Sequence, residues 1–501
     1  MNDMGLATRT SIRLRGDVSR VVSRLFIPGQ ELIGGSESRA ANTVERLLVL
    51  DEDEVDAALE DLFKRFDARH EDLARVFDDH ADRVSDYVTT PITRQRHRLI
   101  GAAFTHEYSI EGAAVCNPSM VAHPDQSAVP EGALRVTMSI RAVGEGHHSS
   151  ICFRTGVIDA GGAVHLEDAQ PFPVVGNLSS TQLNRDLFHA LLHDLGFDGE
   201  TAASVLNNLA GQFSVLELEA AVTKLQTQND TRLNVVKTAG LLRLIAACFY
   251  QVSFGPDVDL SRRVLWPAAP NEGNGMEDAR FVEMSEPGVA RYIASYTAFD
   301  GHSVSQQLLE TDDFLTFTSS PLAGRGARNK GLGFFPRRVN GRFVAMSRFD
   351  RESNAIAYSD DLHRWDKVVT AQVPQHSWEV VQLGNCGSPI ELPEGWLVMT
   401  HGVGPMRTYG IGAILLDLDD PSKMIGQLPR PLLVPTTDEQ DGYVPNVVYS
   451  CGSLVHDGTL YTPYGIADQS ISCASVPIAD LLASLEPPSR LSKLEKPLVR
   501  K

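Results

Sequence analysis

Residues Asn340-Gly-Arg-Phe-Val-Ala-Met-Ser347 place a two-residue turn directly before an apolar stretch. Asn-Gly is a strong hairpin signal, and the residues after it are typical of a β-strand. The same pattern recurs as Glu394-Gly-Trp-Leu397 and as Asp457-Gly-Thr-Leu-Tyr461. Evenly spaced strands joined by turns are typical of a sandwich, a barrel or a propeller. The recurring turn favours a propeller, in which each blade is an up-and-down sheet of about four strands.

The region after Phe254 contains strand candidates but no helical periodicity. Short apolar runs alternate there with Gly, Asn and Asp, which is the spacing expected of consecutive hairpins. Earlier strand candidates, within residues 113–157, suggest that one blade precedes this region. The strand candidates after Phe254 are 290–297, 314–318, 342–347, 355–359, 395–400, 410–416, 453–456, 459–463 and 471–476.

Two other segments have helical periodicity. Apolar residues recur at helical spacing over residues 41–89, where Asp51 to Asp53 can cap a second helix, and again over 179–250. We therefore expect an all-β propeller with an N-terminal helical segment and a helical insertion. The predicted boundaries are 1–99 for a largely helical extension, 100–178 for the first blade, 179–252 for the insertion, 253–485 for the remaining blades and 486–501 for a tail.

Composition narrows the function classes. The 501-residue chain carries a formal net charge of −19, which argues against a nucleic-acid or anionic-membrane partner. Its six cysteines show no metal-ligand spacing and read as buried thiols of a reducing compartment. No apolar run is long enough to cross a membrane, and no signal peptide is evident at the start. We expect a soluble, cytoplasmic protein, in which any anionic ligand is held by a local cluster of Arg and Lys.

The stretch Asn271-Glu-Gly-Asn-Gly-Met-Glu-Asp-Ala-Arg280 pairs two carboxylates with a nearby arginine. Neighbouring strand residues point to opposite faces, so only one of Glu277 and Asp278 faces a given cavity. Arg280 would keep a buried carboxylate ionised, whereas a like-charged neighbour would oppose ionisation. The stretch is either a surface turn with an ion pair or a site for acid–base chemistry.

Several other short polar stretches lie beside predicted strands, where the loops of a propeller gather a ligand. His147-His148 lacks a third ligand in register, so we predict no metal site. The stretches contain Asn117-Pro-Ser, Arg141-Ala-Val-Gly, Arg328-Asn-Lys330, Ser347-Arg348, Thr400-His401-Gly, Tyr409-Gly-Ile-Gly, Tyr443-Val-Pro-Asn446 and Tyr464-Gly-Ile-Ala-Asp468.

These motifs, in this order, resemble glycoside hydrolase family 130, the β-mannoside phosphorylases and their mannosidase relatives. The resemblance covers about residues 100–485 without the helical insertion. It rests mainly on Arg-Ala-Val-Gly, Glu-Asp-x-Arg, Phe-Pro before an Asn-Gly turn, and Thr-His-Gly. It also includes Leu415-Leu-Asp-Leu-Asp-Asp-Pro, which leads to Tyr443-Val-Pro-Asn-Val-Val-Tyr-Ser-Cys-Gly452. The family fold is a five-bladed β-propeller.

The resemblance implies an enzyme that cleaves a β-mannosidic bond with inversion. In the phosphorylases inorganic phosphate is the co-substrate and α-mannose 1-phosphate is released, and no other cofactor is implied. The family's general acid corresponds to Asp278, which is thought to pass its proton through a sugar hydroxyl. The implied phosphate-binding residues are Arg328, Lys330, Arg348, His401 and Tyr409. The implied substrate-binding residues are Asn117, Arg141, Glu277, Arg280, Asn446 and Asp468.

Each assignment has a structural alternative. Arg141 is either a sugar contact or an ion-pair partner inside the fold. Arg348 also fits an exposed strand charge, and Arg328 and Lys330 fit solvated loop charges. His401 also fits a core histidine. The remaining alternative is that Asp468 caps a turn.

Three functions remain open. The first is an inverting β-mannoside phosphorylase. The second is a hydrolase on the same scaffold, for which Asp350 and Glu352 are the carboxylates available near Arg348. The third is a non-catalytic, sugar-binding propeller. The apolar stripes of the helical segments predict packing against the propeller or between subunits, so we also expect a homo-oligomer.

Overall fold

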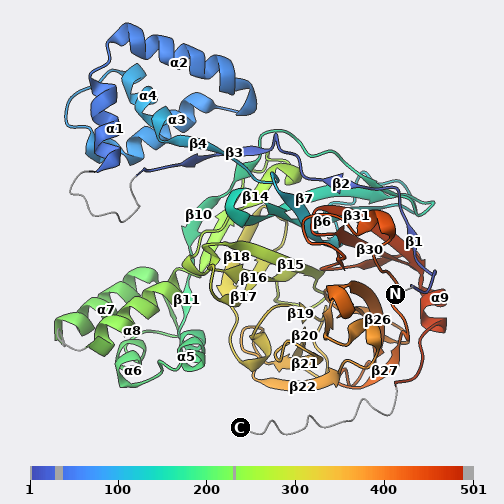
Figure 1. Ribbon diagram of the computed structural model, residues 1–501. Helices are drawn as coiled ribbons and strands as arrows, with labels where there is room; N and C mark the ends of the chain where they lie inside the picture. Colours follow the sequence, from blue (N-terminus) through green and yellow to red (C-terminus); the bar gives the residue numbers. More distant parts are fainter. Residues whose placement is uncertain (1–2, 29–37, 229–232, 489–501) are drawn as a thin grey trace.

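The computed structural model describes residues 3–28, 38–228 and 233–488. Most of the described chain forms β-strands, and the longer helices fall in two segments of the sequence (Figure 1). Residues 229–232 of the predicted helical insertion and residues 489–501 of the predicted tail lie outside the described residues.

The first helical segment stands at the end of a two-stranded ribbon (Figure 1). The ribbon pairs β3, Val21–Leu25, with β4, Thr105–Ser109. The predicted cap is confirmed, because the Asp51 side chain accepts from the Glu54 amide at the start of α2 and Glu54 bonds back to Asp51. The helices of this unit are α1 (Arg39–Leu48), α2 (Glu52–Phe66), α3 (Leu73–Arg83) and α4 (Arg94–Ala103).

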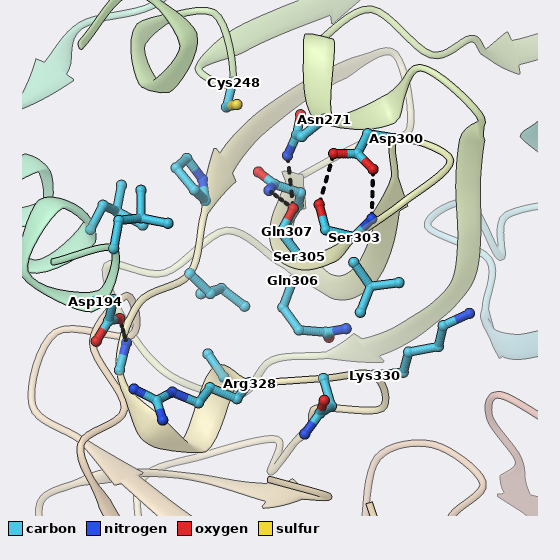
Figure 2. A pocket seen from close by; sticks show the side chains of 18 of the residues that line it. Asp194, Cys248, Asn271, Asp300, Ser303, Ser305, Gln306, Gln307, Arg328 and Lys330 are labelled. Atoms are coloured by element: carbon cyan, nitrogen blue, oxygen red, sulfur yellow. Dashed lines mark hydrogen bonds between the residues drawn. The ribbon is translucent and has the colours of Figure 1, made fainter. Parts of the chain in front are cut away.

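The second helical segment connects two neighbouring strands. Strand β10, Asn177–Ser180, pairs antiparallel with β13, Tyr250–Ser253, so the segment leaves and re-enters the same sheet. Its helices share one apolar core and stand beside β17 and β18 (Figure 1). Between them and the sheet lies a cleft (Figure 2). The elements of the segment are β11 (Leu183–Asn184), α5 (Arg185–Asp194), α6 (Glu200–Leu206), β12 (Gln212–Phe213), α7 (Val215–Gln228) and α8 (Leu233–Ala246).

The largest sheet has twelve strands and contains two antiparallel meanders, β5–β8 and β15–β18. A parallel pairing between Gly275 and Ser149 joins the two meanders. The strands are β5 (Ala114–Ala122), β6 (Leu134–Val143), β7 (Ser149–Ile158), β8 (Val164–Leu166), β9 (Val174–Val175), β10, β13, β14 (Arg263–Leu265), β15 (Gly275–Glu283), β16 (Tyr292–Phe299), β17 (Val304–Thr311) and β18 (Thr316–Pro321).

Three smaller sheets follow along the chain. The first contains β19 (Gly333–Phe334), β20 (Phe343–Ser347), β21 (Asn354–Ser359) and β22 (Lys367–Gln372). The second contains β23 (Gln382–Asn385), β24 (Ile390–Leu392), β25 (Gly395–Val403), β26 (Tyr409–Leu416) and β27 (Met424–Gln427). The third contains β1 (Thr8–Arg9), β2 (Leu14–Arg15), β28 (Val448–Tyr449), β29 (Leu454–His456), β30 (Thr459–Ile466) and β31 (Ser470–Pro477), and helix α9 (Ile478–Ala483) follows it.

The two ends of the described chain meet in the last sheet. Thr8 pairs with Ser475 and Leu14 pairs with Ile471, so the N-terminal strands cover the edge of β31. The last sheet also touches the first meander, because Ser119 forms a bridge with Gly452. A side chain at Gly452 would collide with the Ser119 hydroxyl, so glycine is required for this close approach. The strand set therefore closes on itself.

Two consecutive hairpins use the same loop chemistry. In the β16–β17 loop, both the amide and the hydroxyl of Ser303 donate to the Asp300 carboxylate. In the β20–β21 loop, Ser353 makes the same pair of hydrogen bonds to Asp350. The loops read Phe-Asp-Gly-His-Ser and Phe-Asp-Arg-Glu-Ser, so the two sheets repeat one structural unit.

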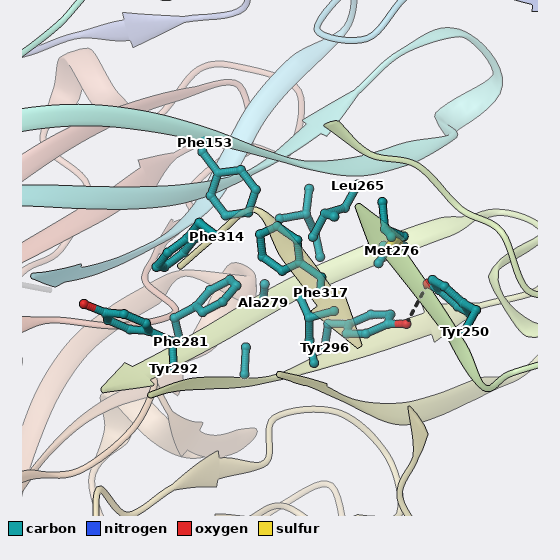
Figure 3. Close-up of a cluster of buried hydrophobic side chains, with 14 of the residues drawn as sticks. Phe153, Tyr250, Leu265, Met276, Ala279, Phe281, Tyr292, Tyr296, Phe314 and Phe317 are labelled. Carbon is teal, nitrogen blue, oxygen red and sulfur yellow. Dashed lines mark hydrogen bonds between the residues drawn. The ribbon is translucent and has the colours of Figure 1, made fainter. Parts of the chain in front are cut away.

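Apolar side chains of β7, β13 and β15–β18, all in the twelve-stranded sheet, form one large buried cluster (Figure 3). Phe153 stacks on Phe317 at 5.6 Å between ring centroids and meets Phe314 edge to face, which are favourable aromatic geometries. Met276 and Phe281 of β15 belong to this cluster. The strand that carries Glu277 and Asp278 is therefore held by core packing on both sides of the acidic pair.

Candidate active site

Asp278 lies at a bulge in β15. The pairing with β16 shifts register between Glu277 and Arg280, and the backbone of Asp278 has φ 57°. Aspartate tolerates this left-handed conformation better than most residues. The residue is only 7% exposed, which excludes the surface turn considered above. The bulge re-aims one carboxylate of the pair, as bulges beside active sites commonly do.

A second bulge brings Asn117 to the same carboxylate. Strand β5 shifts register between Cys116 and Ser119, and Asn117 has φ 50°. Its side-chain amide donates to Asp278 Oδ1. The Asn117 side-chain oxygen is buried without a partner among the described residues. It is therefore available to accept a hydrogen bond from a ligand hydroxyl.

Arg280 is fully buried directly beside the acid. It donates from Nη1 to the backbone oxygen of Asp278 at 2.8 Å and from Nη2 to the hydroxyl of Tyr449 at 2.7 Å. Its Nη2 lies 3.9 Å from Asp278 Oδ2. Arg280 thus holds the backbone of Asp278 in place and links it to Tyr449 of the last sheet.

The charges around Asp278 set its ionisation. Burial acts most strongly and in the direction that raises its pKa. The positive charges of Arg280, Lys330 and Arg141 outweigh burial, with help from the Asn117 hydrogen bond, and hold the pKa below its usual value. In the free protein Asp278 is therefore a carboxylate within an excess of positive charge.

Glu277 points away from Asp278 and binds two cations. Arg141 donates to its Oε1 at 2.7 Å, and the Lys330 ammonium is bonded to its Oε2. Arg141 is thus an ion-pair partner inside the fold. Its Nε remains buried without a partner among the residues described, so a contact with a ligand is also open to it.

Arg348 follows β20 and reaches the centre of the same cluster. An added Cβ at Gly331 would lie 3.2 Å from Arg348 Cδ and 3.7 Å from Arg280 Nη2, and one at Gly384 would collide with both Arg348 and His401. Within the described part of the chain, the Arg348 guanidinium has no ion-pair partner and its Nε is buried without a hydrogen bond. A half-buried cation without an ion pair favours an anionic ligand.

His401 is a buried, neutral histidine. Burial lowers its pKa well below the usual value, and the charges of Arg348 and Arg280 lower it further. Its Nδ1 lies 3.2 Å from the backbone oxygen of Asn385. The ring stacks on Tyr409 at 5.9 Å and meets Tyr449 edge to face at 4.8 Å.

Two predicted residues lie at the rim of this cluster. The backbone oxygen of Asn446 accepts from the Tyr409 amide at 3.0 Å, and Asn446 itself has φ 63°. Asp468 has φ 48° and is half-buried. Burial raises the pKa of Asp468 to about 6, with a further rise from Asp278 and an opposing effect of Arg141. Asp468 therefore lies close enough to Asp278 and Arg141 for their charges to affect its ionisation.

Arg328 differs from the other predicted residues because its side chain is exposed and, within the described part of the chain, forms no hydrogen bond or ion pair with them. It lines a cleft of about 1090 Å³ together with Lys330 and Arg348 (Figure 2). Asp278 does not line this cleft. The cations therefore connect the buried acid to an open groove beside the helical insertion.

Tyr449 is a site residue that the sequence patterns did not single out. Its hydroxyl accepts from Arg280 and its ring contacts His401 and Tyr409. The available signal was its position in the stretch 443–452, three residues after Asn446. Within residues 3–28, 38–228 and 233–488 no group of His, Cys, Asp and Glu side chains could hold a metal ion. In those same ranges no helix is long and apolar enough to span a membrane.

Comparison with known proteins adds independent information. The family model described as beta-1,4-mannooligosaccharide phosphorylase matches residues 259–486. The 1,2-beta-oligomannan phosphorylase of Thermoanaerobacter sp. (strain X514) is 34% identical over 235 residues, which are 44% of this chain and 75% of that relative. The beta-1,2-mannobiose phosphorylase of the same organism is 32% identical over 259 residues, which are 50% of this chain and 83% of that relative.

The chain is also similar to solved structures. The beta-1,2-mannobiose phosphorylase from Listeria innocua, in complex with beta-1,2-mannobiose, is 20% identical with a TM-score of 0.45 and covers 75% of this chain and 92% of its own. The sequence matches carry the assignment, since they exceed 30% identity over most of the length of two relatives. The chain belongs to glycoside hydrolase family 130, the β-mannoside phosphorylase family.

Proposed function

We propose that this protein is an inverting glycoside phosphorylase, which cleaves β-mannosides with inorganic phosphate and releases α-mannose 1-phosphate. The observation that carries the proposal is one cluster in which the buried Asp278 carboxylate and Arg280 lie with the half-exposed Lys330. An inverting phosphorylase needs a proton donor on one side of the sugar and an anion site on the other. The named activities of the relatives, 1,2-beta-oligomannan and beta-1,2-mannobiose phosphorylase, support the same reaction class.

The phosphate site is assigned to Arg328, Lys330 and Arg348, with His401 and Tyr409 beside it. Arg348 supports this assignment because its guanidinium is without an ion pair in the described chain. A guanidinium presents paired N–H donors that match phosphate oxygens. Neutral His401 adds no charge, and because its Nδ1–H donates to the Asn385 backbone oxygen, its Nε2 is left to accept a hydrogen bond from a hydroxyl of the bound phosphate.

The reaction would proceed by direct displacement. A phosphate oxygen forms a bond to C1 of the mannose while the bond from C1 to the aglycone oxygen breaks. The proton that the aglycone oxygen gains comes from Asp278, directly or through a sugar hydroxyl, and Asp278 regains a proton from solvent. Asn117, Arg141, Glu277, Arg280, Asn446 and Asp468 are assigned to binding the sugar and positioning the acid.

Phosphate binding explains how Asp278 can donate a proton although its pKa is lowered in the free protein. The free site holds an excess of positive charge, which keeps Asp278 ionised. A phosphate dianion beside Arg348 and Lys330 would offset that charge. Because a nearby negative charge disfavours ionisation, bound phosphate raises the pKa of Asp278. Phosphate thus serves as nucleophile and prepares the acid.

The hydrolase alternative needs a carboxylate that activates water. Asp350 accepts hydrogen bonds from the amides of Glu352 and Ser353 and from the Ser353 hydroxyl. These bonds hold the hairpin loop and occupy the carboxylate. Glu352 is exposed at the tip of the same loop. This arrangement favours phosphate over water as the nucleophile.

We further propose that the sheets form a five-bladed propeller. Five strand sets support this arrangement: β5–β8, β15–β18, β19–β22, β23–β27 and β28–β31. Figure 1 shows these sets following one another around a shared middle. The Ser119–Gly452 bridge between first and last set, and the repeated Asp–Ser loops, fit the same plan.

The test is direct. Purified protein is incubated with mannose 1-phosphate and a panel of mannosides as acceptors, and released phosphate is measured. Release that requires an acceptor and is lost in Asp278→Asn supports phosphorolysis. Cleavage of β-mannosides at the same rate with and without phosphate would instead identify a hydrolase. Absence of turnover with every donor would identify a binding protein.

A further inference from the structure

Two hairpin loops in different sheets have the same structure. They are the β6–β7 loop, residues 144–148, and the β25–β26 loop, residues 404–408. In each loop the amide of the first residue donates to the backbone oxygen of the fifth, at 3.1 Å and 2.9 Å respectively. The third and fourth residues have positive φ in both loops, and the fourth residues are His147 and Arg407. These two exposed side chains therefore occupy equivalent positions.

Both loops continue strands that carry residues of the candidate active site. Arg141 of β6 lies six positions before His147, and His401 of β25 lies six positions before Arg407. A strand advances about 3.3 Å per residue, so each loop begins about 10 Å beyond its site residue. The two loops thus extend the site outward from the reacting groups.

Tyr443 joins the first of these loops to the last sheet. Its hydroxyl is hydrogen-bonded to the His147 ring, and the two ring centroids lie 5.0 Å apart. The next residue, Val444, donates its amide to the backbone oxygen of Ala467 at 2.8 Å, and Asp468 follows directly. Tyr443 is 42% exposed, so part of this aromatic pair remains open to a ligand.

Polar groups that have no protein partner gather near this pair. The carboxylate of Asp468 forms no hydrogen bond or ion pair in the described part of the chain. Burial raises the pKa of Asp468, and the charge of Arg407 is close enough to oppose that effect. The buried side-chain oxygen of Asn117 is also free among the described residues. Acceptors beside a guanidinium donor suit a ligand with neighbouring hydroxyl groups, such as a sugar.

These groups lie on the acid side of the site. Asp278 accepts from Asn117 of β5, and the backbone of Asn117 packs on Gly465 near the end of β30. The cations Lys330 and Arg348 come instead from the loop after β18 and the residue after β20. An inverting displacement puts the leaving group beside the acid and the nucleophile on the opposite face. The leaving group therefore extends toward the first meander and the last sheet.

We propose that His147, Arg407 and Tyr443 bind the leaving group of the substrate, and that this leaving group is a sugar. The inference rests on the proposed function, which places the reacting carbon beside Asp278. The aromatic pair offers an apolar surface, and Arg407 with Asp468 offers hydrogen bonds that fix the orientation of the sugar. In the reverse reaction the same residues bind the acceptor. They are specificity-determining residues, and none of them takes part in the displacement.

The synthetic direction tests this, because donor and acceptor are then separate molecules. Phosphate release is measured over a series of mannose 1-phosphate and over a series of the better acceptor of mannose and glucose. In Arg407→Gln we expect KM for the acceptor to rise at least about ten-fold, the effect of one hydrogen bond to a charged group. KM for mannose 1-phosphate should stay unchanged. Hexanol, which has no neighbouring hydroxyls, should not replace the sugar acceptor.

Further variants separate the ring of Tyr443 from its hydroxyl. Tyr443→Phe removes only the bond to His147, so it should raise KM for the acceptor less than Tyr443→Ala. Arg342→Gln and His165→Gln are matched controls at exposed side chains with ion-pair partners elsewhere in the fold, and they should leave both Michaelis constants unchanged.

The outcomes separate this inference from the proposed function. Turnover with an unchanged acceptor KM in Arg407→Gln and Tyr443→Ala would overturn the inference and keep the function. An equal rise in both Michaelis constants would also overturn it. If no donor is turned over, the function fails, and calorimetric titration with β-1,2-mannobiose decides. Binding that weakens at least about ten-fold in Arg407→Gln supports the site, and unchanged or absent binding overturns it.

Discussion

Asp278 must supply a carboxyl group and also adopt an unusual backbone conformation. Its backbone lies in the left-handed region at φ 57°, where aspartate and asparagine are the best tolerated side chains after glycine. Asn117 and Asn446 share this conformation at the same site. Strain of this kind persists at functional sites because surrounding packing holds it. Replacing the acid by asparagine therefore changes its chemistry while keeping its conformation.

We expect Asp278→Asn to lower kcat for phosphorolysis by about 10²–10⁴-fold, the usual contribution of a general acid. The thermal unfolding temperature should stay close to that of the wild type. Asp480→Asn, on an exposed turn of α9, is the matched control and should retain full activity. Unchanged phosphorolysis in Asp278→Asn would remove this residue from the mechanism.

In the proposed phosphate site, Glu277 would compete with phosphate for the cations. Its carboxylate is bonded to Arg141 and Lys330 in the free protein. In Glu277→Gln the site gains one net positive charge, so KM for phosphate should fall several-fold. The same charge holds Asp278 more firmly ionised, so kcat should fall as well. Initial rates over a phosphate series measure both constants, and a raised KM for phosphate would contradict this account.

At the residue scale the sequence predicted which types of residue matter better than how they meet. Glu277 and Asp278 were expected to face opposite sides, and they bind different partners. The bulges at Asn117 and Asp278 could not be predicted, because register depends on the partner strand. Tyr449 was missed for a related reason, since its contact with Arg280 joins strands 169 positions apart.

At the scale of elements, the helical insertion holds the loop that carries two of the cations. The Asp194 carboxylate at the end of α5 accepts from the Gly324 amide, and this residue begins the loop to Arg328 and Lys330. Ala323 also packs into the apolar core of the insertion. The insertion thus acts as a support for the proposed phosphate site.

Loss of the hydrogen bond between Asp194 and Gly324 should weaken phosphate binding more than sugar binding. In Asp194→Ala we expect KM for phosphate to rise about three- to ten-fold, the effect of roughly one lost hydrogen bond, with a smaller change in KM for the mannoside. Asp198→Ala removes an exposed carboxylate that pairs only with His193 in the described structure and serves as control. Equal changes in both Michaelis constants would indicate general loosening instead.

The N-terminal helical unit contains its own pH response. His80 of α3 is 8% exposed, and burial lowers its pKa to about 4. The unfolded segment binds a proton below about pH 6.5 that the folded segment does not. The stability of the unit is therefore full above pH 6.5 and falls by up to about 1.4 kcal/mol per unit as the pH drops toward 4.

Hydrogen exchange measures this response. Amides of α3 and α4 should lose protection between pH 6.5 and pH 4.5 after correction for the intrinsic rate. His80→Gln, which can keep the hydrogen bond that joins His80 to Thr105, should flatten the pH dependence. His97→Gln removes a more exposed histidine and should not. Identical slopes in all three proteins would disprove the role of His80.

Element type was predictable wherever local pattern decides it. The Asp51 cap and the strands around Asn340-Gly341 follow from local chemistry, and Asn340 adopts φ 51° as a hairpin turn requires. The joining of β10 to β13, and of β5–β8 to β15–β18, depends on pairing between distant segments. Such pairing leaves no local signal, so the size of the twelve-stranded sheet could not be predicted.

At the scale of the whole molecule, the N-terminal strands close the last sheet. Leu14 pairs with Ile471 and packs against an apolar cluster of the first and last sheets. An uncovered edge of β31 would expose unpaired backbone groups and invite aggregation. The contact therefore links the beginning of the chain to the stability of its end.

Leu14→Asp should destabilise the protein by about 1–3 kcal/mol, the cost of a charge at a packed apolar position. A lower midpoint of thermal unfolding and increased light scattering on heating are the expected observations. Val18→Asp introduces the same charge at a residue that is 67% exposed and should leave both unchanged. If the two variants behave alike, the closing strands contribute little. The expected homo-oligomer stays a prediction, which sedimentation velocity would test.

The antiparallel partnership of β10 with β13 has an evolutionary consequence. Asn177 pairs with Ser253 and Ser180 pairs with Tyr250. The helical insertion between these two strands therefore leaves the sheet and re-enters it at the same place. A single recombination event could add, remove or exchange this insertion in the gene. The hydrogen bonds between the strands of the sheet would be kept. Related proteins that share the candidate active site could in this way come to differ in their substrates by exchanging this one insertion.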